Sequence, residues 1–326
     1  MYRAHRPKRP GRIFLRWLLL LPFALALVGA SGCASDSRQP SDLDPAHKPH
    51  PLVGKIWSSE AASYISSEEL VAAVTEVDYL LLGEVHDNPE HHQLQAWLVA
   101  GYPGAPRSAT VGFEQIDSDR AARLDQYLLE HPDNAADLGA AIAWSESGWP
   151  QWSLYEPVFQ QVLNRGWRPV PLMFGADKIP AVGESGFSAV LDQNAVNVLQ
   201  PGTALSAEQT AATEALMRSS HCDRLPEAYL PKMVAIQTAR DAHMAWKQVE
   251  SGPRGILIVD DGHARKDRGI PLFLRRLKPD AAIVVISMAE VVPDMTAPAD
   301  YQQALASYSD YVLFTERHER EDPCAA

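Results

Sequence analysis

Four polar side chains follow apolar runs of the sequence, at the points where those runs end. Glu84 and His86 follow the run 78–82, Glu114 follows the run 110–113, and His263 follows the run 256–259. Imidazole and carboxylate groups are ordinary ligands of zinc, iron and manganese, so Glu84, His86 and His263 predict a divalent metal site. All four residues also suit a catalytic acid and base pair, because burial and a neighbouring carboxylate move the pKa values of His and Glu toward neutrality. A structural interpretation stays open, in which these side chains cap helices or pair with Arg265.

The apolar runs themselves predict a mainly parallel central sheet. They are short, rich in Val, Ile and Leu, and not alternating, which is typical of strands buried on both faces. In such a sheet ligands bind beyond the carboxyl ends of the strands, so we expect the four polar residues to meet at one edge. The fold class is therefore α/β, with flanking helices as the crossover connections. The predicted strands are 78–82, 110–113, 170–174, 256–259 and 282–287, with a late strand over 311–315 at an edge of the sheet.

Helical insertions are expected to form a large cap subdomain over the sheet. One insertion spans about 119–165 and the other about 176–250. The second ends in a long helix that begins near Pro231, because proline suits the first helical position. A sheet with a helical cap leaves a crevice at the strand ends.

Further polar residues are placed at this crevice. Gln237 and Asp241 lie one turn apart on the long helix, on a face with apolar neighbours, so they are predicted to line the cleft together with Arg265. Exposure of that face to solvent is an equal alternative. His91 and His92 fall in the first turn of another predicted helix, where they are either solvated or ligands of a metal.

The N-terminus has the layout of a secretory signal peptide. Six basic residues precede an apolar run from Trp17 to Ala30, which is shorter than the roughly 20 residues that a spanning helix needs. Small residues stand directly before Cys33, which resembles the bacterial lipobox. This resemblance implies cleavage before Cys33 and acyl chains such as palmitate on the new N-terminus. Ala34, rather than Asp, after the cysteine implies a lipid anchor on the periplasmic face of the outer membrane.

The chain is expected to have four parts. They are a signal peptide over 1–32, a lipidated flexible tether over 33–52, the folded domain over 53–318 and a disordered tail over 319–326. Removal of a signal with six basic and no acidic residues lowers the formal net charge from −12 to about −18. A chain this acidic is a poor nucleic-acid binder, because phosphate contacts need clustered Lys and Arg.

Two cysteines remain after cleavage, Cys222 and Cys324. An oxidising periplasm permits a disulfide between them, but their positions in the sequence do not show whether they meet.

Four sequence blocks resemble the signature of the ChaN lipoproteins, in the same order. They are Leu81 to His92, Ser220 to Glu227, Arg240-Asp241, and Gly262 to Pro271. The ChaN lipoproteins are iron-regulated haem-binding proteins of a superfamily that includes the Tiki proteases and the erythromycin esterases. The similarity runs from about residue 53 to about 315 and implies an α/β core with a helical cap.

The resemblance also implies a homodimer that holds haem at its interface through a tyrosine. Phenolate is an axial ligand of ferric haem, and the two candidates are Tyr155, at the start of a cap helix, and Tyr229, just before the long helix. Two features depart from the family pattern. Asp260-Asp261 precedes Gly262-His263 where Gly-Asn is more usual, and Tyr229 stands where a small or thioether residue is familiar. The extra carboxylates favour a cation near His263 and disfavour haem propionates.

Three functions are compatible with these observations. The first is an outer-membrane lipoprotein that binds haem for uptake or storage, with an outer-membrane haem receptor as a partner. The second is a hydrolase, metal-dependent or not, because the superfamily relatives use Glu and His at the positions of Glu84, His86, Glu114 and His263. The third is a lipoprotein with an inactive cleft that contacts another envelope protein.

Overall fold

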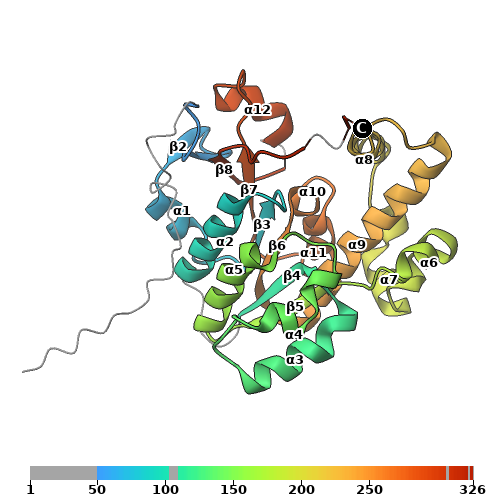
Figure 1. Ribbon diagram of the computed structural model, residues 1–326. Helices are drawn as coiled ribbons and strands as arrows, with labels where there is room; N and C mark the ends of the chain where they lie inside the picture. The colour runs from blue at the N-terminus through green and yellow to red at the C-terminus, as the bar shows by residue number, and fades with distance from the viewer. Residues whose placement is uncertain (1–49, 103–108, 306–307, 322–323, 326) are drawn as a thin grey trace, which may run out of the picture. The chain divides into compact units, whose positions relative to one another are not determined.

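A central sheet of eight strands organises the molecule, in the order β2-β1-β8-β7-β3-β6-β4-β5. The computed structural model describes residues 50–102, 109–305, 308–321 and 324–325 (Figure 1). Every strand pair from β8 to β5 is parallel, whereas β1 pairs antiparallel with β2 and β8. This confirms the predicted α/β class. The strands are β1 (Ile56–Ser58), β2 (Ser63–Ile65), β3 (Tyr79–Glu84), β4 (Ala109–Asp117), β5 (Arg168–Met173), β6 (Arg254–Asp260), β7 (Ile283–Glu290) and β8 (Tyr311–Thr315).

Helices connect the strands and cover both faces of the sheet. The α-helices are α1 (Ser67–Ala73), α2 (Pro89–Gly101), α3 (Ala121–Glu130), α4 (Leu138–Ala141), α5 (Trp152–Asn164), α6 (Lys178–Ser185), α7 (Gln193–Leu199), α8 (Ala207–Ser220), α9 (Leu230–Ser251), α10 (Asp261–Ala264), α11 (Ile270–Leu277) and α12 (Pro298–Leu305). The 3-10 helices of the described residues are η3 (Ser118–Arg120), η4 (Trp144–Glu146), η5 (Gly186–Ala189), η6 (Pro201–Thr203) and η7 (Glu227–Tyr229). No helix in the described ranges is long and apolar enough to cross a membrane.

The central strand β3 shows why the apolar runs do not alternate. Leu80 and Leu82 belong to a core cluster with residues of α2 and α5, and Tyr79 and Leu81 belong to a second cluster with residues of α9 and α11. Figure 1 shows these two pairs of helices on opposite sides of the sheet. All four side chains are fully buried. Burying each one stabilises the fold by about 1.5–3 kcal/mol, so both faces of this strand must be apolar.

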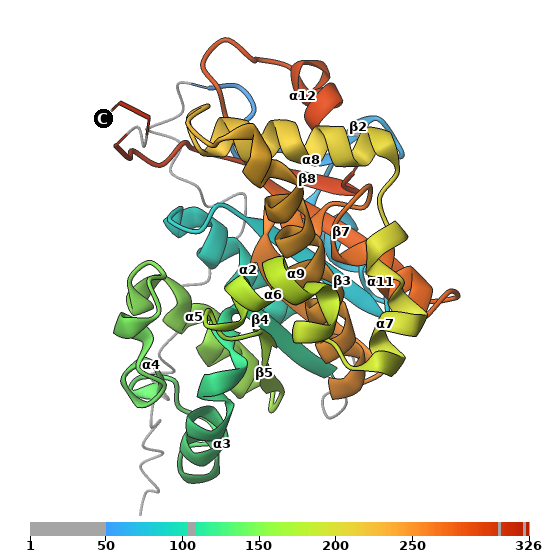
Figure 2. The ribbon, with the colours of Figure 1, turned by 90° about the vertical axis from the view of Figure 1, so that its right-hand side faces the viewer.

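The predicted second helical insertion forms four helices, α6 to α9. Figure 2, viewed from their side, shows them in front of the sheet. The long helix begins one residue before the predicted Pro231 and packs directly on the sheet, since Ala242 and Met244 join the core of that face.

The edge of the sheet differs from the prediction. The late strand 311–315 was expected at an edge, but β8 lies between β7 and β1. The prediction was wrong because β1 and β2 have three residues each, and β2 is largely exposed, so neither has the apolar run that marks a buried strand.

Both ends of the domain hold contacts that the sequence did not predict. Leu52, assigned to the predicted tether, is buried, whereas the predicted signal peptide and Cys33 lie outside the described residues. In the tail, which was expected to be disordered, Arg320 forms ion pairs with Asp87 and Glu290. A disulfide joins Cys324 to Cys222.

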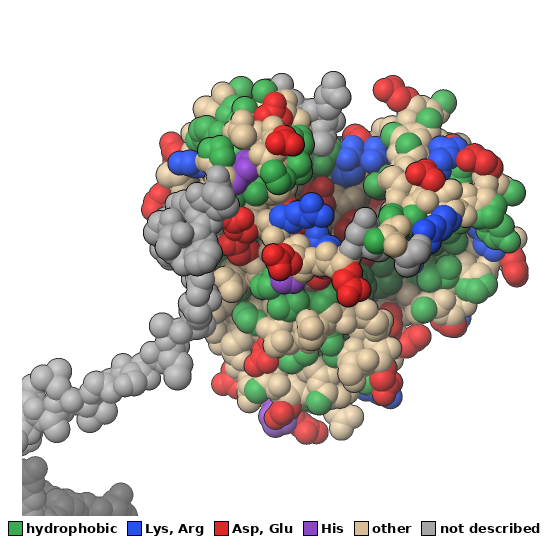
Figure 3. All heavy atoms as spheres, turned by 45° about the horizontal axis from the view of Figure 1, so that its top comes forward, with side chains coloured by type: hydrophobic (Ala, Val, Ile, Leu, Met, Phe, Trp, Pro, Cys, Tyr) green, Lys and Arg blue, Asp and Glu red, His purple; other side chains and the backbone are tan. Residues whose placement is uncertain are grey.

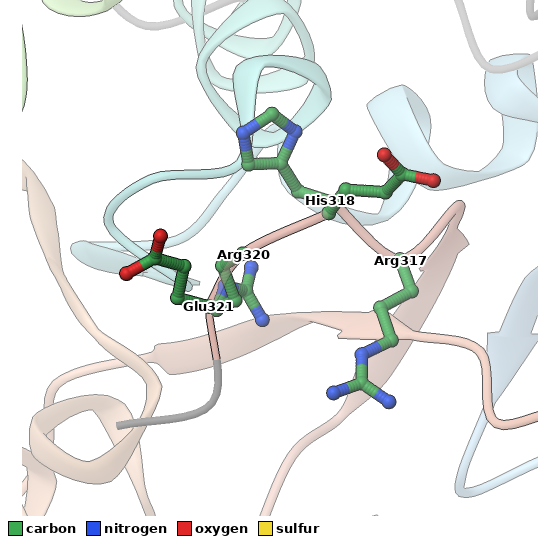
Figure 4. A pocket seen from close by; sticks show the side chains of 5 residues that line it. Arg317, His318, Arg320 and Glu321 are labelled. Atoms are coloured by element: carbon green, nitrogen blue, oxygen red, sulfur yellow. The ribbon is translucent and has the colours of Figure 1, made fainter. Parts of the chain in front are cut away.

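The stretch 317–321 lines an open pocket of about 540 Å³ (Figure 4). Figure 4 shows side chains that project from one continuous stretch of chain, so this pocket brings together no groups from different elements.

Candidate functional site

Glu84 is the centre of a buried polar network at the carboxyl edge of the sheet. It is the last residue of β3 and is fully buried. Its carboxylate accepts hydrogen bonds from the Tyr155 hydroxyl at 2.7 Å and from the side-chain amides of Gln95 at 2.6 Å and Gln115 at 2.9 Å. The Nδ1 atom of His86 lies 2.8 Å from Glu84 Oε1. Four donors around one buried carboxylate satisfy a charge that would otherwise be costly to bury.

The neighbours of Glu84 fix its charge. Burial alone would raise the pKa of Glu84, but His92 and His86 lower it to about 2. Burial would likewise lower the pKa of His86, but the hydrogen bond to Glu84 and the charges of Glu114 and Asp260 raise it to about 10. At neutral pH the pair is therefore a carboxylate and an imidazolium.

A second buried group surrounds His263, which lies on α10 just after β6. Its Nδ1 is 2.6 Å from Asp241 Oδ1, and its Nε2 is 3.5 Å from Glu114 Oε1. The amide nitrogen of Gln237 lies 3.1 Å from Nδ1. Gln237 and Asp241, which were predicted to line the cleft, thus lie beside His263.

His263 is also charged at neutral pH. Desolvation would lower its pKa, but Glu114 and Asp241 raise it to about 9. Burial raises the pKa of Asp241 to about 6, despite the opposing effect of His263. Between these values Asp241 is anionic and His263 cationic, so they form an ion pair.

The two groups meet through Asp260 and Glu114. The backbone N–H of Asp260 donates to Glu114 Oε2 at 2.7 Å, and Asp260 Oδ2 lies 3.8 Å from His86 Nε2. The structure therefore brings together all four polar residues expected at this edge of the sheet. On the same side of the molecule, Figure 3 shows acidic and basic side chains around a hollow.

The other predicted site residues have structural partners. Arg265 binds both carboxylate oxygens of Asp267 at 2.7 and 2.8 Å and lies over the Tyr308 ring, so its charge is already matched. Asp260 caps α10 by accepting from the Gly262 N–H. No three His, Cys, Asp or Glu side chains in the described part of the chain are arranged to hold a metal ion, so the proposed metal set gains no support.

The two candidate haem ligands have opposite environments. Tyr155 is fully buried, its hydroxyl donates to Glu84, and burial followed by the charge of Glu84 raises its pKa strongly. Its phenol is neither accessible nor readily ionised. Tyr229 is 55% exposed and stands at the N-terminus of α9.

His91 and His92 are buried rather than solvated. His91 Nδ1 accepts from the Val85 N–H at 2.8 Å, and its Nε2 is 2.9 Å from the Thr315 hydroxyl. Because Nδ1 is an acceptor, this imidazole is neutral, and burial followed by the charge of His92 lowers its pKa to about 3. His91 thus links the loop after β3 to the end of β8.

Sequence reasoning missed Gln95 and Gln115 as partners of Glu84. Gln95 lies one turn after His91 in α2 and is followed by the apolar residues Ala96 to Val99, and a polar residue in this apolar stretch was the available signal. Gln115 directly follows Glu114 in β4 and carried no signal of its own.

Comparison with known proteins identifies the family. The family model described as "Haem-binding uptake, Tiki superfamily, ChaN" matches residues 70–274. The solved structure titled "Cofacial heme binding to ChaN of Campylobacter jejuni" is similar with a TM-score of 0.64 and 22% identity, covering 79% of this chain and 95% of that one.

Two more distant structures have TM-scores of 0.42. The type III effector HopBA1 is 14% identical over 76% of this chain and 92% of its own. A mutant of the erythromycin esterase EreC in its open conformation is 11% identical over 83% of this chain and 100% of its own. No curated protein sequence matches significantly. The match over 70–274 shows that the chain belongs to the ChaN haem-binding uptake family of the Tiki superfamily.

Proposed function

We propose that the chain is an outer-membrane lipoprotein that binds haem for uptake or storage. Family membership carries the haem part of this proposal, because the matching family is described as haem-binding and spans most of the folded domain. The Campylobacter protein with the same fold is likewise described as binding heme.

We assign the iron ligand to Tyr229. Ferric haem takes a phenolate as an axial ligand, and the phenol must reach the iron from an accessible surface. Tyr229 is 55% exposed, whereas Tyr155 is fully buried and hydrogen-bonded to Glu84. Tyr229 also occupies the N-cap position of α9, where the positive end of the helix dipole favours negative charge.

A haem on Tyr229 would lie on a surface and not in a deep cavity. The whole segment 226–229 is exposed. One porphyrin face would then remain in water, which is unfavourable for so large an apolar surface. We therefore propose that a second copy of the chain covers the haem, giving a homodimer.

Hemin titration tests this function. The purified protein is titrated with hemin while the Soret band and the mass of the assembly are recorded. The proposal predicts a saturable Soret shift at stoichiometric hemin together with a dimer. A spectrum that stays that of free hemin would overturn it.

The lipid anchor and the location are part of the same proposal. Cys33 would carry the lipid, and an outer-membrane haem receptor would be the partner. Metabolic labelling with a fatty acid should mark the wild-type chain in the outer-membrane fraction. Cys33→Ser should abolish both the label and the membrane association, and label retained by this variant would refute Cys33 as the lipidated residue.

A second candidate is a hydrolase, which the two buried His–carboxylate groups favour. With pKa values of about 10 for His86 and about 9 for His263, both imidazoles are protonated at neutral pH and can act as acids. A neutral imidazole base forms only at alkaline pH. Any ester hydrolysis by His263 should therefore rise toward pH 9 and vanish in His263→Gln, whereas a rate that is flat with pH would exclude His263 as the base.

A further inference from the structure

A small cavity lies next to the buried network, outside the groups that bind Glu84. It has a volume of about 200 Å³. Glu114 and Asp117 of β4, Arg240 of α9 and Trp149 of the loop before α5 lie on its wall. None of the residues 221–229 lines it, so it is separate from the proposed haem surface. Residues from several elements thus converge on one hollow, as in small-molecule sites.

The two carboxylates of this cavity already have partners. Glu114 accepts from the Asp260 N–H and faces His263. Asp117 accepts from the Asp119 N–H at 3.1 Å and from Arg120 Nε at 3.1 Å. The cavity therefore has no carboxylate oxygen pair left to attract a cation.

In the described part of the chain, the Arg240 side chain has one donor without a partner, its Nε–H. Its Nε atom is buried, and among the described residues no acceptor binds it. Its neighbour Asp241 is engaged with His263. A guanidinium cannot be deprotonated in a protein, and a buried donor without an acceptor is costly. Arg240 therefore presents a permanent charge and a free Nε–H donor to the cavity.

The remaining wall limits what can bind Arg240. The rest of the cavity wall is largely apolar and includes Trp149, Met173, Phe174 and Ile179. One guanidinium balances one negative charge, and its planar donors match a carboxylate. At about 200 Å³ the cavity is smaller than the roughly 300–1,000 Å³ of drug-sized sites. We propose that this cavity binds a small monocarboxylate with an apolar body, its carboxylate on Arg240 and its apolar part against Trp149 and Met173.

Calorimetric titration with phenylacetate tests the site, and phenylacetamide is the neutral probe of the same shape. The full chain should bind phenylacetate and bind phenylacetamide at least tenfold more weakly. Arg240→Gln should weaken phenylacetate at least tenfold and leave the weak phenylacetamide binding unchanged. Arg240→Lys, which keeps the charge without the planar fork, should give an intermediate affinity.

Arg123→Gln is the matched control, because Arg123 is exposed on α3 and lies outside the cavity. It should bind phenylacetate like the wild type. Unfolding curves establish that each variant is folded. Equal phenylacetate affinity in the wild type and in folded Arg240→Gln, or no measurable binding by the wild type, would overturn the proposal. Neither outcome depends on hemin, so a failure here is distinct from a failure of haem binding.

Discussion

His91 should make the fold sensitive to acid. The imidazole is fully buried between the Val85 N–H and the Thr315 hydroxyl, and its pKa is lowered to about 3. The unfolded chain takes up a proton at this residue as the pH falls through 6.5, whereas the folded chain does not until about pH 3. Stability is therefore lost across that window. The linkage relation gives a loss of about 2 kcal/mol between pH 7 and pH 5.

The measurement must separate His91 from groups that respond in the opposite direction. His86 and His263 have raised pKa values, so their contribution to stability is fully present below pH 6.5 and is lost as the pH rises through about 10 and 9. Acidification from pH 7 to pH 5 strengthens that contribution. The contribution of His86 and His263 cancels when the wild type is compared with a His91→Gln variant, because both proteins contain these two histidines. The amide of the variant can replace both hydrogen bonds of His91 and does not titrate.

Urea unfolding at pH 7 and pH 5 provides the assay. The free energy of unfolding of the wild type should fall by about 2 kcal/mol more than that of His91→Gln. His131→Gln makes the same substitution at an exposed histidine, and its free energy of unfolding should change with pH as that of the wild type does. The same pH dependence in the wild type and His91→Gln would refute the neutral, buried state of this imidazole.

Three further perturbations probe the network and the tail. Tyr155→Phe removes the hydrogen bond to a buried carboxylate and should lower the free energy of unfolding in urea by about 1.5–3 kcal/mol; no change would show that the bond contributes nothing. Asp241→Asn removes a negative charge beside His263, so the pKa of His263, measured by NMR, should fall below about 9; a pKa that stays at about 9 would contradict the effect of Asp241. Cys222→Ser opens a disulfide between residues 102 positions apart and should lower stability by about 2–5 kcal/mol, as should reductant on the wild type but not on the variant.

The parallel strands were predictable because each buried strand corresponds to a short continuous run of apolar residues in the sequence. A strand such as β3, buried on both faces, needs a continuous apolar run, and a parallel sheet brings the strand ends to one edge. That is why Glu84, Glu114 and His263 were correctly expected to meet. The short strands β1 and β2 have no such run and were missed.

The hydrogen-bond partners inside the site were not predictable from local sequence. Tyr155 is 71 residues from Glu84, and its amphipathic helix position suits a buried or an exposed phenol equally. Whether the Nε–H of Arg240 finds an acceptor depends on the other partners of nearby carboxylates, such as the contact of Asp241 with His263. The disulfide likewise depends on where the tail runs, and Cys222 and Cys324 lie far apart in the sequence.

The paired tyrosine variants test the central claim most directly. Hemin is titrated into the wild type, Tyr229→Phe and Tyr155→Phe, and the Soret band and the iron–phenolate resonance Raman bands are recorded. Tyr229→Phe should lose the phenolate bands and bind hemin more weakly. Tyr155→Phe should keep the wild-type spectrum, because its phenol is buried against Glu84. Phenolate bands that persist in Tyr229→Phe and vanish in Tyr155→Phe would contradict the assignment.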